Sequence, residues 1–283
     1  MSPLLKIRAE RDSMSAIERR IADFILDEAH LLRDYSSQQL ANALGISQSS
    51  VVKFSQKLGF KGYPDLKTSI GEAIARGDGG EGNGHAEKPV RDDPHSALAE
   101  SLWQSKSLAE QETRLINPHD RVDAIATAIG HAGRVFIIGL GEDGIPARAF
   151  ALRLSLIDIL TVHHFDAVLM TASIAAAEAG DVLLVFSEHG QQPALCQIGR
   201  QFRERHGTVV SVTRHTANPL RAIADLSVLV SAHDDRAHVR PLLYASALHH
   251  LLDMLFVLLC EDRGQRLERL HANLERIRHL LEP

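Results

Sequence analysis

The chain has 283 residues, a length typical of two domains. Its 45% hydrophobic and 24% charged residues exclude a long disordered or collagen-like chain, and two cysteines are too few for a disulfide framework. The N-terminus has no apolar signal-peptide core, and the apolar runs fall short of the ~20 residues of a membrane span. We therefore expect a cytoplasmic protein without a membrane partner.

The charge is unevenly distributed. Residues 1–76 hold 11 Lys and Arg against 9 Asp and Glu, whereas the whole chain carries a net charge of −5. A weakly basic segment on an acidic chain fits a nucleic-acid-binding domain, but a solvated helix face gives the same pattern.

The first 76 residues are predicted to be helical. Ser15–Ala29 begins with Ser15 as N-cap and Glu18 completing a capping box. The apolar side chains that recur at helical spacing in this segment are Ile17, Ile21, Phe24 and Ile25. Three further helices are predicted: Ser37–Ala43, Gln48–Leu58 and one that starts near Pro64.

Residues 37–56 have the pattern of a helix-turn-helix. Ala41 allows two helices to cross closely, Gly45 tolerates the positive φ of a tight turn, and Ser47 is suited to cap the second helix. The apolar positions expected to face the shared core are Leu40, Leu44, Ile46, Val51 and Phe54. An ordinary helical hairpin with a polar face is the alternative.

The outward face of the second helix suits the major groove of DNA. It carries short polar groups near its start and cations further along, with no carboxylate between Ser47 and Gly62. Such side chains reach base edges and neutralise phosphates. The predicted DNA-contacting residues are Ser37, Gln48, Ser49, Ser50, Lys53 and Lys57.

A glycine-rich segment follows, and Gly77–Pro94 has glycine at five of its first eight positions. We predict a flexible linker at 77–95, between a DNA-binding domain at 1–76 and a second domain at 96–283. Helices are expected at Ala97–Ile116 and His119–His131.

Short β-branched apolar runs then alternate with helix-compatible stretches. The five predicted strands are Arg134–Leu140, Leu160–Phe165, Asp181–Ser187, Thr208–Thr213 and Leu226–Val230. This alternation predicts an α/β fold with a doubly wound, five-stranded parallel sheet. Two closing helices, Leu242–Cys260 and Gln265–Leu281, are expected to form core or subunit contacts.

Polar loops follow the first and third predicted strands: Gly139–Gly144 (GLGEDG) and Ser187–Pro193 (SEHGQQP). Ligands of open parallel sheets bind at such carboxyl ends, near helix N-termini. The first loop has G-x-G-x-x-G spacing, but no acidic residue ends the next strand, which argues against a dinucleotide. No cofactor or metal is predicted. Neither adjacent pair, His163-His164 or His249-His250, can chelate a metal, because adjacent side chains point in different directions. A set of Asp143, His189 and a third ligand is the remaining metal alternative.

The order of helical segment, linker and sheet resembles the RpiR-type bacterial transcriptional regulators, whose C-terminal half is a flavodoxin-like sugar-isomerase (SIS) domain. Gly45–Lys67 is similar to the family's recognition helix, the two polar loops resemble its phosphate loops, and Val209–Asp225 resembles its next strand. The resemblance implies a sequence-specific regulator of carbohydrate or related catabolic genes. It also implies double-stranded operator DNA, a homodimer or homotetramer, and a small effector such as a sugar phosphate or sugar acid as partners.

The ligand residues implied by the resemblance are Gly141, Asp143, Ser187, His189, Gly190 and Gln192. Of the family's phosphate ligands only Ser187 is retained, and the carboxylate of Asp143 repels a phosphate dianion. One hypothesis is that Asp143 itself occupies the anion position, with His189 as its partner, in a site that takes no ligand or a different one. The alternative is that Asp143 only caps its helix and His189 is solvated.

Two other functions remain as alternatives. One is a sugar-phosphate isomerase-like enzyme with an accessory DNA-binding domain, in which Glu142, Glu188 or His189 serves as base. The other is a DNA-binding protein whose SIS domain only dimerises. The altered phosphate loops and the fused helix-turn-helix favour a regulator without catalytic residues.

Overall fold

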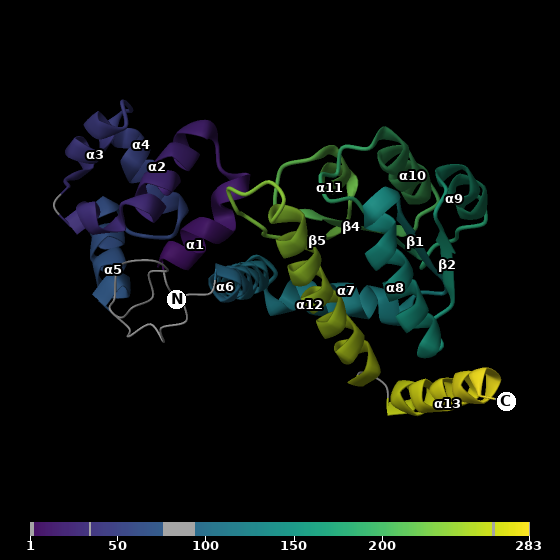
Figure 1. The fold of residues 1–283 in the computed structure, drawn as a ribbon. Coiled ribbons are helices and arrows are strands. Elements are labelled where there is room, and N and C mark those ends of the chain that lie inside the picture. The colour runs from purple at the N-terminus through teal and green to yellow at the C-terminus, as the bar shows by residue number, and fades with distance from the viewer. Residues whose placement is uncertain (1–2, 34, 76–93, 262–263, 283) are drawn as a thin grey trace. The chain divides into compact units, whose positions relative to one another are not determined.

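The computed structural model describes residues 3–33, 35–75, 94–261 and 264–282. The chain forms two compact units, Met1–Leu115 and Ile116–Pro283, which are described separately (Figure 1). Most of the predicted linker, residues 77–93, lies outside the described residues, and its last two residues begin a helix.

The first unit is helical. Its elements are α1 (Pro3–Glu10), η1 (Arg11–Ser13), α2 (Ala16–Asp27), η2 (Ala29–Arg33), α3 (Ser37–Ala43), α4 (Gln48–Lys57), α5 (Tyr63–Ala75) and α6 (Pro94–Ile116), whose last residue lies past the unit boundary. The predicted helices correspond to α2 through α6. Helix α1 was not predicted, although its Leu4 and Ile7 are buried, because one helical turn of apolar residues is too short a signal.

Local hydrogen bonds fix where these helices begin. Ser15 and Glu18 form the predicted capping box of α2, in which the Ser15 N–H donates to Glu18 Oε2 at 2.8 Å. Ser36 and Gln39 form a second capping box at α3, which was not predicted. Of the apolar side chains at helical spacing in α2, Ile21 and Ile25 are buried and Phe24 is partly buried, whereas Ile17 in the first turn is 47% exposed.

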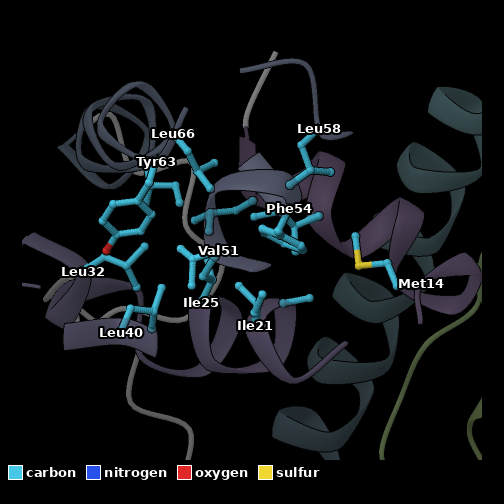
Figure 2. Packing of buried hydrophobic residues seen from close by; sticks show 14 of the residues in the cluster. Met14, Ile21, Ile25, Leu32, Leu40, Val51, Phe54, Leu58, Tyr63 and Leu66 are labelled. Carbon is cyan, nitrogen blue, oxygen red and sulfur yellow. The ribbon is translucent and has the colours of Figure 1, made fainter. Parts of the chain in front are cut away.

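One apolar core holds the helix-turn-helix together. Figure 2 shows Ile21 and Ile25 of α2, Val51 and Phe54 of α4, and Leu66 of α5 around the same interior. The remaining residues predicted to face the core are also in this cluster: Leu40 is buried, and Leu44 and Ile46 are partly buried. Gly45 has φ +59°, as the predicted turn requires. The helix-turn-helix prediction is confirmed.

The second unit contains the sheet. Its elements are α7 (His119–His131), β1 (Val135–Gly139), η3 (Gly141–Asp143), α8 (Gly144–Leu156), β2 (Thr161–His164), α9 (Ala167–Ile174), β3 (Val182–Phe186), α10 (Pro193–Glu204), β4 (Thr208–Arg214), α11 (Pro219–Ile223), β5 (Leu226–Val230), α12 (Arg240–Glu261) and α13 (Gly264–Leu281). The strands form one parallel sheet in the order β2-β1-β3-β4-β5, which confirms the predicted doubly wound fold.

Helices cover both faces of this sheet. Helices α9, α10 and α11 pack on one face, and α7, α8 and α12 on the other (Figure 1). Strands β1 and β3 are buried along their whole length, as expected for central parallel strands. The edge strand β5 is paired by a side chain: Asn117 Nδ2 donates to the Leu229 carbonyl at 2.6 Å, and the Leu229 N–H donates to Asn117 Oδ1 at 3.1 Å.

The strand order places the two polar loops side by side. From β1 the chain continues to β2 on one side, and from β3 it continues to β4 on the other side. The order in which strands are added to the sheet therefore reverses between β1 and β3. Gly139 at the end of β1 is the register partner of Phe186 at the end of β3. The loops after these two strands therefore meet at the topological switch point, where ligands of this fold class bind.

The two C-terminal helices differ in burial. One side of α12 is buried in the second unit, so this helix is part of the core. By length and composition it is also the one helix in the described ranges that could cross a membrane, although such a test is also passed by a buried core helix. In α13, for which core or subunit contacts were expected, Leu267, Leu274, Ile277 and Leu281 form an exposed apolar stripe that is not part of the core.

Candidate functional site

The start of α4 is organised by a small hydrogen-bond network. Ser47 caps the helix by accepting from the Ser50 N–H at 3.2 Å, and its hydroxyl also contacts the hydroxyls of Ser49 and Ser50 at 2.8 Å. Gln48 Nε2 donates to Ser37 Oγ of α3 at 2.9 Å. Four of the predicted DNA contacts therefore lie together at the N-terminal ends of α3 and α4.

The two predicted phosphate-binding lysines are in different environments. Lys53 is exposed, and no partner for it occurs in the described ranges. Lys57 lies 2.9 Å from both carboxylate oxygens of Glu18. Burial alone raises the pKa of Glu18, but the hydrogen bonds from Lys57 and Ser15 outweigh it and lower that pKa. Lys57 is thus already paired with an anion, a contact that the sequence did not reveal.

Glycines allow the tight connection from β1 to α8. A Cβ on Gly139 would lie 2.4 Å from the Asp143 carbonyl oxygen, and one on Gly144 would lie 2.9 Å from the Gly139 carbonyl oxygen. This turn aims Asp143 at the neighbouring loop. Its carboxylate oxygens accept from the Glu188 N–H at 3.1 and 3.2 Å, and it makes no side-chain capping bond to α8. The alternative in which Asp143 only caps its helix was therefore wrong.

The second loop is held by the start of α11. The Gly190 N–H donates to the buried Ser187 Oγ at 3.2 Å, and the Gly190 carbonyl accepts from the Leu220 N–H at 3.1 Å. Gly190 has φ +61°, and a Cβ there would lie 2.0 Å from Asn218 Oδ1. A side chain at position 190 would thus push the loop off α11 and move the Glu188 amide.

The other predicted ligand residues are more peripheral. Gly141 is exposed with φ +61°, His189 is exposed, and Gln192 is half-buried at the N-terminus of α10. The predicted pairing of His189 with Asp143 does not occur as a contact among the described residues. His189 acts on that carboxyl group only through its charge, which opposes the net rise of the Asp143 pKa that burial causes.

Two side chains that sequence reasoning missed, Arg214 and Tyr244, complete the arrangement together with Glu188, which was predicted only as a candidate base of the isomerase alternative. Glu188 Oε1 accepts from Arg214 Nε at 2.7 Å, and Arg214 Nη1 donates to the Ala232 carbonyl at 2.7 Å. The Arg214 guanidinium lies 5.8 Å from the centre of the Tyr244 ring. Arg214 ends β4, a position that could have singled it out, but nothing local marks Tyr244 within the apolar α12. We call Asp143, Glu188, Arg214 and Tyr244 the strand-end cluster.

Two groups of the strand-end cluster, Asp143 and Tyr244, have raised pKa values. Burial raises the pKa of Asp143, and the negative charges of Glu188 and Glu142 raise it further. The hydrogen bond from the Glu188 N–H and the charge of His189 lower this pKa, but the net shift is upward. Burial also raises the pKa of Tyr244 well above 10, and the charges of Asp143 and Glu188 raise it further. Perturbed acids gathered at a topological switch point are typical of a binding site. Within the described part of the chain, no group of three or more metal-ligating side chains forms.

Comparison with known proteins identifies both units. Residues 1–77 match the helix-turn-helix domain of the rpiR family, and residues 128–258 match the SIS domain. The uncharacterized HTH-type transcriptional regulator YfhH of Escherichia coli K12 is 31% identical over 287 residues, which cover 99% of this chain and 97% of that protein. The chain belongs to the RpiR family of transcriptional regulators.

Solved structures share the fold of this RpiR-family regulator. The NanR protein of Vibrio vulnificus, complexed with ManNAc-6P, aligns with TM-score 0.61 at 20% identity over 99% of this chain and 100% of its own. The sugar isomerase domain of an RpiR transcription factor from Sphaerobacter thermophilus aligns with TM-score 0.57 at 17% identity, covering 64% of this chain and 98% of its own.

Proposed function

We propose that this RpiR-family regulator acts in the cytoplasm by inserting α4 into the major groove of operator DNA. The observation that carries the proposal is the outer face of α4. It presents Gln48, Ser49 and Lys53 to solvent on a helix that a buried core and a capped start hold in place. Side chains of this kind read base edges and contact phosphates.

The regulator is proposed to act as a homodimer or homotetramer. Helix-turn-helix proteins commonly read two half-sites about 34 Å apart, which requires two copies of the recognition helix. The exposed apolar stripe of α13 supports such an assembly, because a second chain would remove this stripe from water.

The effector is proposed to be a small carbohydrate-derived molecule that binds at the strand-end cluster and changes operator affinity. The support is the position of the cluster at the switch point between β1 and β3, together with the perturbed acids found there. NanR, which shares the fold, was solved with ManNAc-6P. The genes under control are proposed to serve carbohydrate or related catabolism.

The contacts of two of the three candidate bases, Glu188 and His189, do not favour the isomerase alternative. Of the candidate bases, Glu188 is bound by Arg214, and His189 is exposed with no hydrogen bond to another described side chain. The fused DNA-binding unit favours regulation.

DNA binding is tested with the upstream region of the protein's own gene in a fluorescence anisotropy titration at two salt concentrations. Gln48→Ala is expected to cost about 1–3 kcal/mol of preference for the operator over unrelated DNA. Gln104→Ala, an exposed glutamine of α6, is the matched control and should leave the preference unchanged. Absence of any salt-sensitive affinity for genomic fragments would refute the proposed function.

A further inference from the structure

The hydroxyl of Tyr244 is a buried polar group that forms no hydrogen bond with any described residue. Tyr244 is only 5% exposed, and no described donor or acceptor forms a hydrogen bond with its hydroxyl. Its ring lies beside the Arg214 guanidinium, and the charges of Asp143 and Glu188 act on its hydroxyl. Buried hydroxyls are normally hydrogen-bonded, so this one is placed to bond with something that the chain itself does not supply.

The backbone amide that could hold an anion here is already occupied. The Glu188 N–H follows the carboxyl end of β3, and such an amide is a ready donor to a bound anion. In this protein it donates to both oxygens of the Asp143 carboxylate, from 45 residues away in sequence. Asp143 is therefore a built-in anion at the position where the two loops meet.

The surrounding charge disfavours a second anion. Glu142, Asp143 and Glu188 place three carboxyl groups around this position. The guanidinium of Arg214 is bound to Glu188 Oε1 and to the Ala232 carbonyl. A phosphate dianion would meet like charges and carries no proton to donate to Asp143, whereas a hydroxyl can donate to Asp143 and also accept from Tyr244.

We propose that the strand-end cluster binds an uncharged polyhydroxylated molecule, such as an unphosphorylated sugar or polyol. Asp143 accepts hydrogen bonds from its hydroxyls, and Tyr244 donates one to them. This inference deepens the proposed function, on which it rests, by naming the chemical class of the effector and by excluding phosphorylated sugars.

The first experiment tests whether Asp143 excludes phosphate. Wild-type, Asp143→Ser and Asp143→Asn full-length proteins are titrated with inorganic phosphate and with glucose 6-phosphate by thermal shift and calorimetry. Removal of the carboxylate in Asp143→Ser is expected to tighten phosphate binding at least tenfold over wild type, and the isosteric Asp143→Asn should show a smaller gain. Equal phosphate binding by wild type and Asp143→Ser would overturn the inference.

The second experiment tests whether the Tyr244 hydroxyl serves a ligand. In ligand-free protein, Tyr244→Phe is expected to leave the melting temperature unchanged or raise it, because no hydrogen bond is lost. Tyr63→Phe is the matched control and should lower it, since the Tyr63 hydroxyl donates to the Tyr35 carbonyl at 3.0 Å. A loss of stability in Tyr244→Phe equal to that in the control would overturn the inference.

The third experiment identifies the ligand class with matched pairs: glucose, mannose, ribose and glucitol, each beside its phosphate ester. At least one unphosphorylated member is expected to stabilise wild type more than its ester does. Its affinity should fall at least tenfold in Tyr244→Phe and Asp143→Asn. Stronger stabilisation by the esters, or none by any unphosphorylated member, would overturn the inference. DNA binding measured in parallel separates the failures, because a protein that binds its operator but fails this panel refutes only the ligand class.

Discussion

Lys53 and Lys57 should contribute unequally to DNA affinity, although both lie on α4 and both were predicted to contact phosphate. The perturbation is Lys53→Ala compared with Lys57→Ala. Each phosphate neutralised by a free cation steepens the dependence of log K on log salt by about 0.9, which amounts to about a 3- to 4-fold affinity change between 50 and 200 mM.

Lys57 is not a free cation, since its Nζ lies 2.9 Å from both oxygens of Glu18. With 53% of the lysine side chain and 22% of the glutamate side chain exposed, this is a surface pair worth about 0.2–1 kcal/mol. Lys57 must give up this pair to contact a phosphate. We therefore expect Lys53→Ala to lower the salt slope by about 0.9 per recognition helix, and Lys57→Ala to lower it by less than half of that.

The assay is fluorescence anisotropy with operator DNA over a salt series. Glu18→Gln should steepen the slope by releasing Lys57, while Gln at this position still supports a capping box. The Glu18→Gln effect should vanish in the Glu18→Gln, Lys57→Ala double variant. Equal slope losses in the two lysine variants would refute the reasoning, as they would show that the ion pair with Glu18 does not compete with DNA.

Three further predictions concern the second unit. In urea unfolding, Gly190→Ala should destabilise the second unit by about 2 kcal/mol or more. Gly141 has the same φ of +61° but open space around it, so Gly141→Ala should cost only about 1 kcal/mol. Asn117→Ala should cost about 1–3 kcal/mol by unpairing the edge of β5, and hydrogen exchange of that strand should accelerate. Asp143→Asn should raise the melting temperature at pH 7. Folding raises the pKa of Asp143, so this carboxyl group stabilises the wild-type fold below its ordinary pKa of 3.8, and that stabilisation is lost as the pH rises. The difference in melting temperature between Asp143→Asn and wild type should therefore shrink on acidification. A difference that does not shrink would contradict the role of the Asp143 charge.

The first unit was largely readable from sequence because its signals are local. The Ser15 cap, the Gly45 turn and the apolar spacing from Leu40 to Phe54 each act within a few residues. Spacing alone did not show which apolar side chains are buried, because burial depends on a partner segment. Ile17 has the same spacing as its buried neighbours, but no segment of the described unit covers it.

In the second unit, sequence identified the loops but not the contacts between them. The polar loops after β1 and β3 were found because apolar strands end abruptly there. The pairing of Asp143 with Glu188 required the strand order, since these residues are 45 positions apart. The same holds for Arg214 and Tyr244, which reach the site from β4 and α12.

The sequence by itself thus determined the family, the order of helices and strands, and the two places where function is concentrated, because spacing, capping and turn chemistry are properties of neighbouring residues. The tertiary structure alone decided that Lys57 is paired with Glu18, that Asp143 accepts a hydrogen bond from an amide of the opposite loop, and that the Tyr244 hydroxyl has no partner among the residues that the structure describes. These outcomes depend on distances between segments far apart in the chain, which are set only when the helices and the sheet pack.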